Sequence, residues 1–137
     1  MPTYDAILAQ DTQFLTVAME VCRATHFPLI DAPNTTIPIT ALIDTGATHT
    51  AIREDILLAL NTIPLGRQYV DTAAGPAICD QYFVRLAFPD GKYVDNFRVT
   101  ALPTDITVDC LLGMDILRFG VLIYDGKAGK FSLDFQP

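Results

Sequence analysis

Four segments of the sequence alternate apolar and polar residues, and this period of two limits the chain to folds built mainly from strands. The segments are residues 14–21, 37–43, 82–88 and 93–101. Successive side chains of a β-strand point to opposite faces, so this alternation is typical of strands buried on one face. Turn sequences separate the strand-like runs at Pro33-Asn34, Pro89-Asp90-Gly91 and Asp125-Gly126, and at least two of them predict hairpins. We therefore expect a mostly antiparallel β fold.

Two stretches depart from the strand period. Residues 53–60 hold good helix formers before Asn61, and residues 115–119 predict one short turn that Gly120 would end as a C-terminal cap. No linker is visible, and a chain of 137 residues that is 50% hydrophobic suffices for one core. The sequence therefore predicts one domain over residues 1–137, with one or two short helices.

The charge balance argues against nucleic-acid and membrane partners. The formal net charge is -7, and the six arginines are scattered along the chain, so no basic patch is available for a phosphate backbone. The best apolar run, residues 56–60, is far shorter than the roughly 18 residues of a membrane span. The N-terminal residues lack the basic and apolar regions of a signal peptide. We expect a cytoplasmic protein.

Several catalytic chemistries are also excluded by the residues present. Ser132 is the only serine and has no GxSxG around it, and the glycines form neither of the common phosphate loops. The three cysteines, Cys22, Cys79 and Cys110, are odd in number and form no CxxC pair, which favours reduced thiols. The two histidines stand in no zinc motif, and we expect neither a metal nor another cofactor.

Two weaker possibilities remain among these polar residues. Cys22 and His26 are four residues apart and could form a thiol and base pair, although packing or surface exposure is the favoured explanation for both. Three aspartates, Asp105, Asp109 and Asp115, lack the regular spacing of a calcium loop. We interpret them as turn and cap residues.

The segment around Asp44 is the strongest candidate site. Asp44 directly follows an apolar strand-like run, where an ionisable group is costly unless it is hydrogen-bonded. Gly46 permits a tight turn whose N–H groups can point at the carboxylate, and Thr45 offers a compact hydroxyl. An ordinary strand-ending turn would explain the tripeptide alone.

A second motif supports a family assignment. The run from Leu42 to Ala47, followed much later by Leu111-Leu112-Gly113-Met114-Asp115-Ile116-Leu117, strongly resembles the retropepsin-like aspartic proteases over about residues 14–135. The resemblance implies a closed antiparallel β-barrel of the acid-protease type, equivalent to half of a pepsin molecule. It also implies that Asp44, Thr45 and Gly46 form the catalytic loop, with a structural motif at Leu112, Gly113 and Asp115 packed behind it.

The same resemblance implies a flap, a hairpin that folds over the substrate. The matching interval is residues 68–83, with a tip at Ala73-Ala74-Gly75-Pro76 that lacks the glycine-rich sequence of the viral members. The substrate-binding residues would be Ala47, Ala73, Ala74, Gly75 and Ile78, which suit an extended polypeptide with hydrophobic side-chain pockets. His49 is close enough in sequence to approach the cleft, although an exposed loop position is the simpler interpretation.

The sequence departs from the viral members at positions that support their subunit interface. Viral members have an acidic residue just after the Asp-Thr-Gly-Ala stretch and an arginine after the later glycine, and these residues support an ionic network. Thr48-His49 and Met114 occupy those places here. We therefore expect a different subunit interface.

The chemistry of peptide hydrolysis requires two copies of the chain. A base must activate water while an acid protonates the carbonyl oxygen, and one carboxyl cannot do both at once. Two adjacent carboxyls share a proton and divide these roles. The sequence has one Asp-Thr-Gly, so the resemblance predicts a C2 homodimer in which the two Asp44 side chains meet, and in which Thr45 bonds across the axis.

Two other functions are compatible with the motif. The pattern Asp44-x-Gly46-x-Thr48 looks like the first phosphate motif of actin-like kinases and ATPases, although those folds need a far longer chain. A dimeric peptide-binding or scaffold module could keep the protease fold without turnover. The principal prediction remains an aspartic endopeptidase.

Overall fold

The computed structural model describes residues 4–8, 14–25, 34–72 and 75–136, and these residues form mainly strands. The strands are β1 (Tyr4–Ile7), β2 (Thr16–Arg23), β3 (Ile37–Ile43), β4 (Ala51–Arg53), β5 (Gly66–Thr72), β6 (Gly75–Ala87), β7 (Tyr93–Leu102), β8 (Cys110–Leu112), β9 (Gly120–Asp125) and β10 (Lys130–Phe135). The helices are α1 (Glu54–Ala59) and α2 (Met114–Leu117). The predicted mostly β fold with short helices is confirmed.

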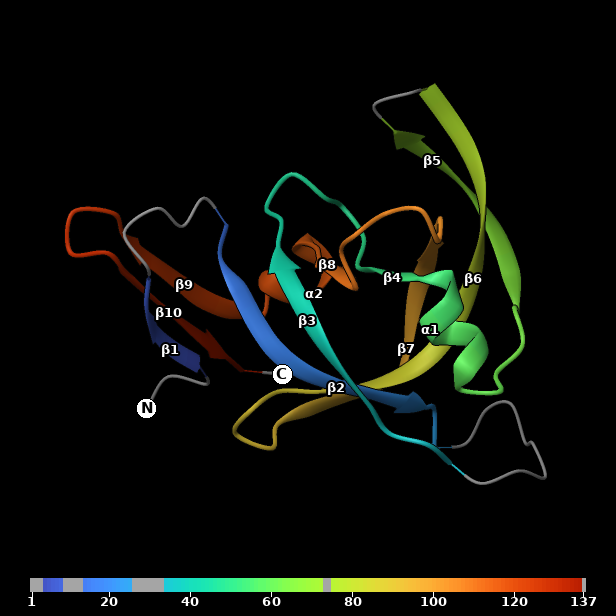
Figure 1. Ribbon diagram of the computed structural model, residues 1–137, viewed down its shortest axis with the longest axis horizontal. Coiled ribbons are helices and arrows are strands. Elements are labelled where there is room, and N and C mark those ends of the chain that lie inside the picture. The colour runs from blue at the N-terminus through green and yellow to red at the C-terminus, as the bar shows by residue number, and fades with distance from the viewer. Residues whose placement is uncertain (1–3, 9–13, 26–33, 73–74, 137) are drawn as a thin grey trace.

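Six strands close into a barrel. The order is β2, β3, β8, β4, β7 and β6, and β6 then pairs with β2 to complete the ring (Figure 1). The closed barrel is as predicted, but two of its pairings, β3 with β8 and β4 with β7, are parallel. The sequence did not indicate these parallel pairings, because β4 and β8 have three residues each, too few to show any pattern.

The longest strand, β6, belongs to two parts of the fold. Its second half pairs with β7 and β2 in the barrel, whereas residues 75–81 pair with β5. The β5–β6 hairpin extends beyond the barrel as a two-stranded ribbon (Figure 1). This ribbon occupies the interval where the resemblance predicted a flap.

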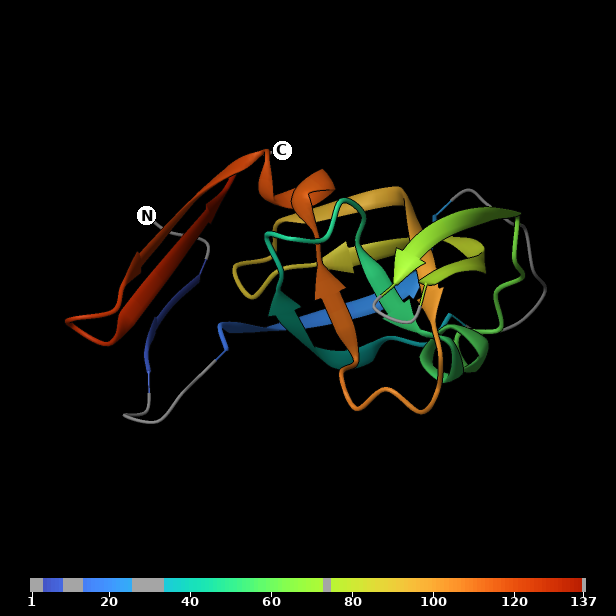
Figure 2. The ribbon, with the colours of Figure 1, turned by 90° about the horizontal axis from the view of Figure 1, so that it is seen from above.

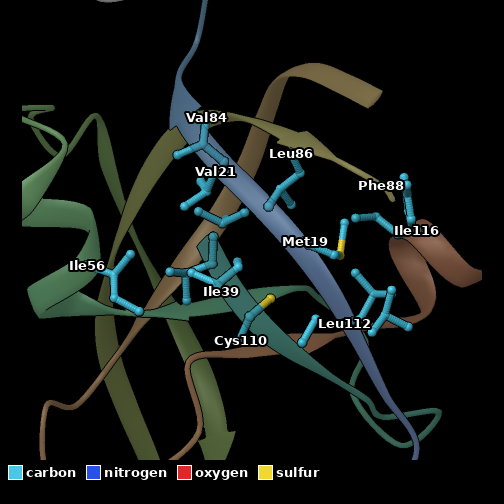
Figure 3. Close-up of a cluster of buried hydrophobic side chains, with 14 of the residues drawn as sticks. Met19, Val21, Ile39, Ile56, Val84, Leu86, Phe88, Cys110, Leu112 and Ile116 are labelled. Atoms are coloured by element: carbon cyan, nitrogen blue, oxygen red, sulfur yellow. The ribbon is translucent and has the colours of Figure 1, made fainter. Parts of the chain in front are cut away.

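The core consists of apolar side chains from the inward faces of the barrel strands (Figure 3). On β2, Val17, Met19 and Val21 are buried, and the residues between them are exposed or half-buried. Ile56 of α1 and Ile116 of α2 belong to the same buried cluster. Burial of each such side chain contributes about 1.5–3 kcal/mol, which fixes the strand register by the hydrophobic pattern.

A second sheet of three strands, β1, β10 and β9, lies beside the barrel (Figure 2). Its inner face buries Phe131, Leu133 and Phe135 of β10. The ring of Phe135 stacks on Phe88 at the end of β6, with the ring centroids 4.4 Å apart. This aromatic pair joins the second sheet to the barrel core.

The turns and helices agree with the sequence except at one glycine. Pro89-Asp90-Gly91 joins β6 to β7, and Asp125-Gly126 joins β9 to β10, so both predicted hairpins are confirmed, while Pro33 lies outside the described residues. The predicted cap at Gly120 is wrong. Helix α2 ends with Arg118 as its cap, and Gly120 begins β9, where a Cβ would lie 2.4 Å from the carbonyl oxygen of Asp134. Among the described residues, no helix has both the length and the apolar character needed to cross a membrane.

Candidate active site

Asp44 is the first residue after β3 and begins a loop held tightly by its own backbone. Its N–H donates to the carbonyl oxygen of Leu112 in the neighbouring strand β8, with an N–O distance of 3.0 Å. The N–H of Gly46 donates to the Asp44 Oδ1 atom at 3.0 Å, and the N–H of Ala47 donates to the Asp44 carbonyl oxygen at 3.1 Å. The sequence-predicted turn therefore places an N–H group on the carboxylate.

The segment that leads into α2 packs directly against this loop. The N–H of Met114 donates to the Ala47 carbonyl oxygen at 2.8 Å, and the N–H of Asp115 donates to the Thr48 carbonyl oxygen at 3.2 Å. A Cβ on the buried Gly113 would lie 2.7 Å from the carbonyl carbon of His49. The close approach expected at Gly113 is therefore present, and no larger residue fits there without displacing the loop.

A buried hydroxyl, which the sequence did not single out, fixes the far end of the loop. Thr50 has no exposed surface, and its Oγ1 donates to Asp115 Oδ1 at 2.7 Å while accepting a hydrogen bond from the Gly113 N–H at 3.1 Å. The Thr50 N–H also donates to both carboxylate oxygens of Asp115. Asp115 therefore supports the loop through Thr50, which corrects the interpretation of this aspartate as an ordinary turn or cap residue.

The β5–β6 ribbon lies in the interval expected for the flap and contacts the loop between Gln68 and His49. Residues from Gly66 to Thr72 pair with residues from Gln81 back to Gly75, and Gly75 has a φ of 111°, which favours glycine. The tip residues Ala73 and Ala74 lie outside the described residues. Ile78 is exposed and, by strand alternation, faces away from the side that carries Gln68, so its role in substrate binding stays a prediction.

A polar contact links the β5–β6 ribbon to the Asp44 loop. The Nε2 atom of Gln68 lies 3.2 Å from the Nε2 atom of His49, and the Gln81 side-chain amide donates to Gln68 Oε1. Both glutamines were missed by the sequence reasoning, because nothing local distinguishes them from other polar strand residues. His49 is exposed, as the simpler interpretation held, yet it contacts the flap.

The positions that carry the ionic network of viral members are arranged differently here. Thr48, His49 and Met114 are all exposed, and neither Thr48 nor Met114 can form an ion pair. This arrangement is consistent with the expected change of subunit interface.

The remaining polar candidates do not converge. Asp109 accepts hydrogen bonds from Arg53 and from the Thr40 N–H, Asp115 binds Thr50, and Asp105 lies in an exposed turn. His26 lies outside the described residues. Within the described residues no group of three or more His, Cys, Asp or Glu side chains could hold a metal ion.

Comparisons with known proteins agree with this geometry. The chain matches the model of the family described as "gag-polyprotein putative aspartyl protease" over residues 33–119, which is well over half of its length. A comparison with curated proteins finds no match.

Solved structures show the same fold. The chain is similar to a retropepsin-like aspartic protease from Rickettsia conorii, with a TM-score of 0.61, 17% identity, and coverage of 96% of this chain and 91% of the other. It is also similar to the retroviral protease-like domain of Ddi1 from Leishmania major, with a TM-score of 0.51, 16% identity, and coverage of 90% and 96%. The family match, the closed barrel and the loop at Asp44 together show that this chain belongs to the retropepsin-like aspartic proteases.

Proposed function

We propose that the protein is an aspartic endopeptidase that acts as a homodimer. The observation that carries this proposal is the position of Asp44, on a rigid loop that ends a core strand, with one carboxylate oxygen held by the Gly46 N–H. Thr50, Gly113 and Asp115 support the loop from behind, and Gln68 of the β5–β6 ribbon contacts it at His49. A preorganised carboxyl under a flap suits attack on an extended peptide.

The reaction needs a second Asp44, which a second chain would supply. Two carboxyls within hydrogen-bond distance cannot both ionise, so the couple holds one proton between them. The ionised carboxyl takes a proton from water, and the water oxygen bonds to the peptide carbonyl carbon, while the protonated carboxyl donates its proton to the carbonyl oxygen. As this tetrahedral intermediate collapses, the carboxyl that took the water proton gives it to the leaving amine nitrogen and the C–N bond breaks, while the other carboxylate takes a proton from a hydroxyl of the intermediate, so the pair again holds one proton.

The exposed residues at the tip of the loop suit contact with a partner. Thr45 and Gly46 are exposed, and Thr45 is adjacent to the carboxyl that would meet its counterpart. We assign Thr45 a hydrogen bond across the two-fold axis that holds the two loops in register. Ala47, half-buried beside the carboxyl, would then border the substrate.

The test is a cleavage assay on a peptide library across acidic to neutral pH, with wild-type protein and the Asp44→Asn variant. Wild-type protein should cleave, and its specific activity should rise with protein concentration because dimers form by mass action. Asp44→Asn should abolish cleavage with unchanged circular dichroism. Cleavage by purified Asp44→Asn, or by a strict monomer, would reject the proposal, and peptide binding without cleavage would instead identify a non-catalytic binding module.

A further inference from the structure

A cavity of about 290 Å³ lies beside the catalytic loop, at the base of the flap ribbon. Its lining comprises His49, Gln68, Gln81, Phe83, Asn96, Phe97, Arg98, Thr100 and Asp115. These residues come from the catalytic loop, from β5, β6 and β7, and from α2. The cavity is therefore bounded by the same two elements, loop and flap, that would enclose a bound peptide.

The floor of the cavity is one face of the sheet. Gln81 of β6 lies directly opposite Thr100 of β7, and Phe83 lies opposite Arg98 two residues further along, so these four side chains share a face. Gln68 of β5 lies on the same face, because its direct partner is two residues before Gln81. The floor is thus set by strand register, independently of any loop.

The cavity lining carries one positive side chain, Arg98, and one carboxylate, Asp115. The guanidinium of Arg98 lies 5.6 Å from the ring centroid of Phe83, and the five ion pairs among the described residues do not include Arg98. The carboxylate of Asp115 already accepts three hydrogen bonds from Thr50. Because Thr50 engages the Asp115 carboxylate, the Arg98 guanidinium is the lining charge left to meet an anionic group, in a chain with a net charge of -7.

The same lining also offers an amide hydrogen-bond donor. Gln68 Oε1 accepts from the Gln81 amide, so the Gln68 Nε2 group is the donor to His49 Nε2 and has a second N–H left to offer a ligand. The rings of Phe83 and Phe97 provide apolar surface next to these polar groups. A carboxylate on a short methylene chain satisfies both features, because guanidinium and amide donors bind carboxylates while methylenes pack on rings.

We propose that this cavity is a substrate subsite that binds an acidic side chain, Glu or Asp, of the peptide. The proposal rests on the proposed function for the peptide itself, and it adds a specificity that the apolar candidates Ala47 and Ile78 do not provide. Arg98 supplies the charge, and the second N–H of the Gln68 amide donates to the carboxylate, while His49 holds that amide at the border of the Asp44 loop.

The first test measures cleavage with a proteome-derived peptide library. Cleaved peptides should be enriched in Glu or Asp at one fixed position relative to the cut. For the best such peptide, replacing that Glu by Gln should lower kcat/KM roughly tenfold, in line with a charge-assisted hydrogen bond. Arg98→Gln should remove this preference. The control variant Arg67→Gln should retain the preference for an acidic residue. Arg67 and its partner Asp80 lie on the face of the ribbon opposite to Gln68 and the cavity.

A second test does not need cleavage or dimerisation. The capped amino acid N-acetyl-glutamate N-methylamide is titrated into the protein, and NMR follows the Arg98 Nε–H and the side-chain amides of Gln68 and Gln81. These resonances should shift with the Glu probe, much less with its Gln analogue, and not in Arg98→Gln. Equal responses to both probes, no response at all, or cleavage without acidic enrichment would overturn the subsite, while absence of cleavage alone would count against the proposed function only.

Discussion

The carboxylate of Asp115 accepts hydrogen bonds from both the backbone N–H and the hydroxyl of Thr50, across 65 positions of sequence, at distances from 2.7 to 3.0 Å. The same hydroxyl accepts from the N–H of Gly113. The far end of the Asp44 loop is therefore joined to the start of α2 by one small network of fully or partly buried groups. Such networks are worth most when every member is satisfied.

Loss of the Thr50 hydroxyl should destabilise the fold. In Thr50→Val the buried Gly113 N–H loses its acceptor and Asp115 loses one donor, so the free energy of unfolding should fall by about 1–3 kcal/mol. Thr50→Ser keeps the hydroxyl, so its free energy of unfolding should fall by less. Urea denaturation of the three proteins measures the difference, and equal stability of the Val and Ser variants would show that the network contributes nothing.

Gly113→Ala should displace the catalytic loop. The added methyl would lie 2.7 Å from the carbonyl carbon and 2.8 Å from the carbonyl oxygen of His49, both backbone atoms that cannot rotate away. We expect a lower Tm and a loss of activity of at least tenfold, because small displacements of reacting groups are costly. Gly66→Ala is the matched control, since its methyl meets only Gln81 Oε1 at 3.6 Å. A fully active Gly113→Ala would contradict this account.

Mixing subunits should reveal whether two carboxyls are needed. When wild-type protein is equilibrated with a tenfold excess of Asp44→Asn, roughly a tenth of its subunits remain in wild-type dimers, so activity should fall to about that level. The same excess of Arg67→Gln, which keeps Asp44, should add activity instead. Undiminished cleavage in the first mixture would mean that one Asp44 suffices.

Cys110 should resist alkylation in the folded protein. Burial raises the pKa of its thiol, and the nearby carboxylates of Asp109 and Asp115 act in the same direction. Because the thiolate is the nucleophile, a raised pKa leaves Cys110 neutral and unreactive at pH 8. Iodoacetamide followed by mass spectrometry should modify the half-buried Cys22 first, and Cys110 only after denaturant is added. Modification of both at one rate in native protein would refute this expectation.

The strands, hairpins and first helix were predictable because their signals are local. Alternation located β2, β3, β6 and β7, helix formers located α1, and turn residues located the hairpins at Asp90 and Asp125. What the alternation could not supply was pairing direction. The parallel contacts of β4 and β8 depend on where the chain crosses the barrel, which no short window of sequence records.

The candidate site was predictable only in part for the same reason. The turn from Asp44 to Gly46 is encoded in three adjacent residues, so its hydrogen bond could be anticipated. The partnership of Thr50 with Asp115 depends on tertiary contact, and each residue alone resembles an ordinary turn residue. Gly120 was misassigned because a glycine after a helix usually caps it, whereas here the close carbonyl of Asp134 requires it.

The continuity of β6 has a mechanical consequence. One strand, β6, pairs with β2 in the barrel wall and with β5 in the ribbon, so on the β6 side no loop separates the ribbon from the barrel. We therefore expect any displacement of the ribbon by a bound peptide to bend a strand that closes the barrel. Peptide binding at Asp44 should therefore be coupled to the packing of the barrel core.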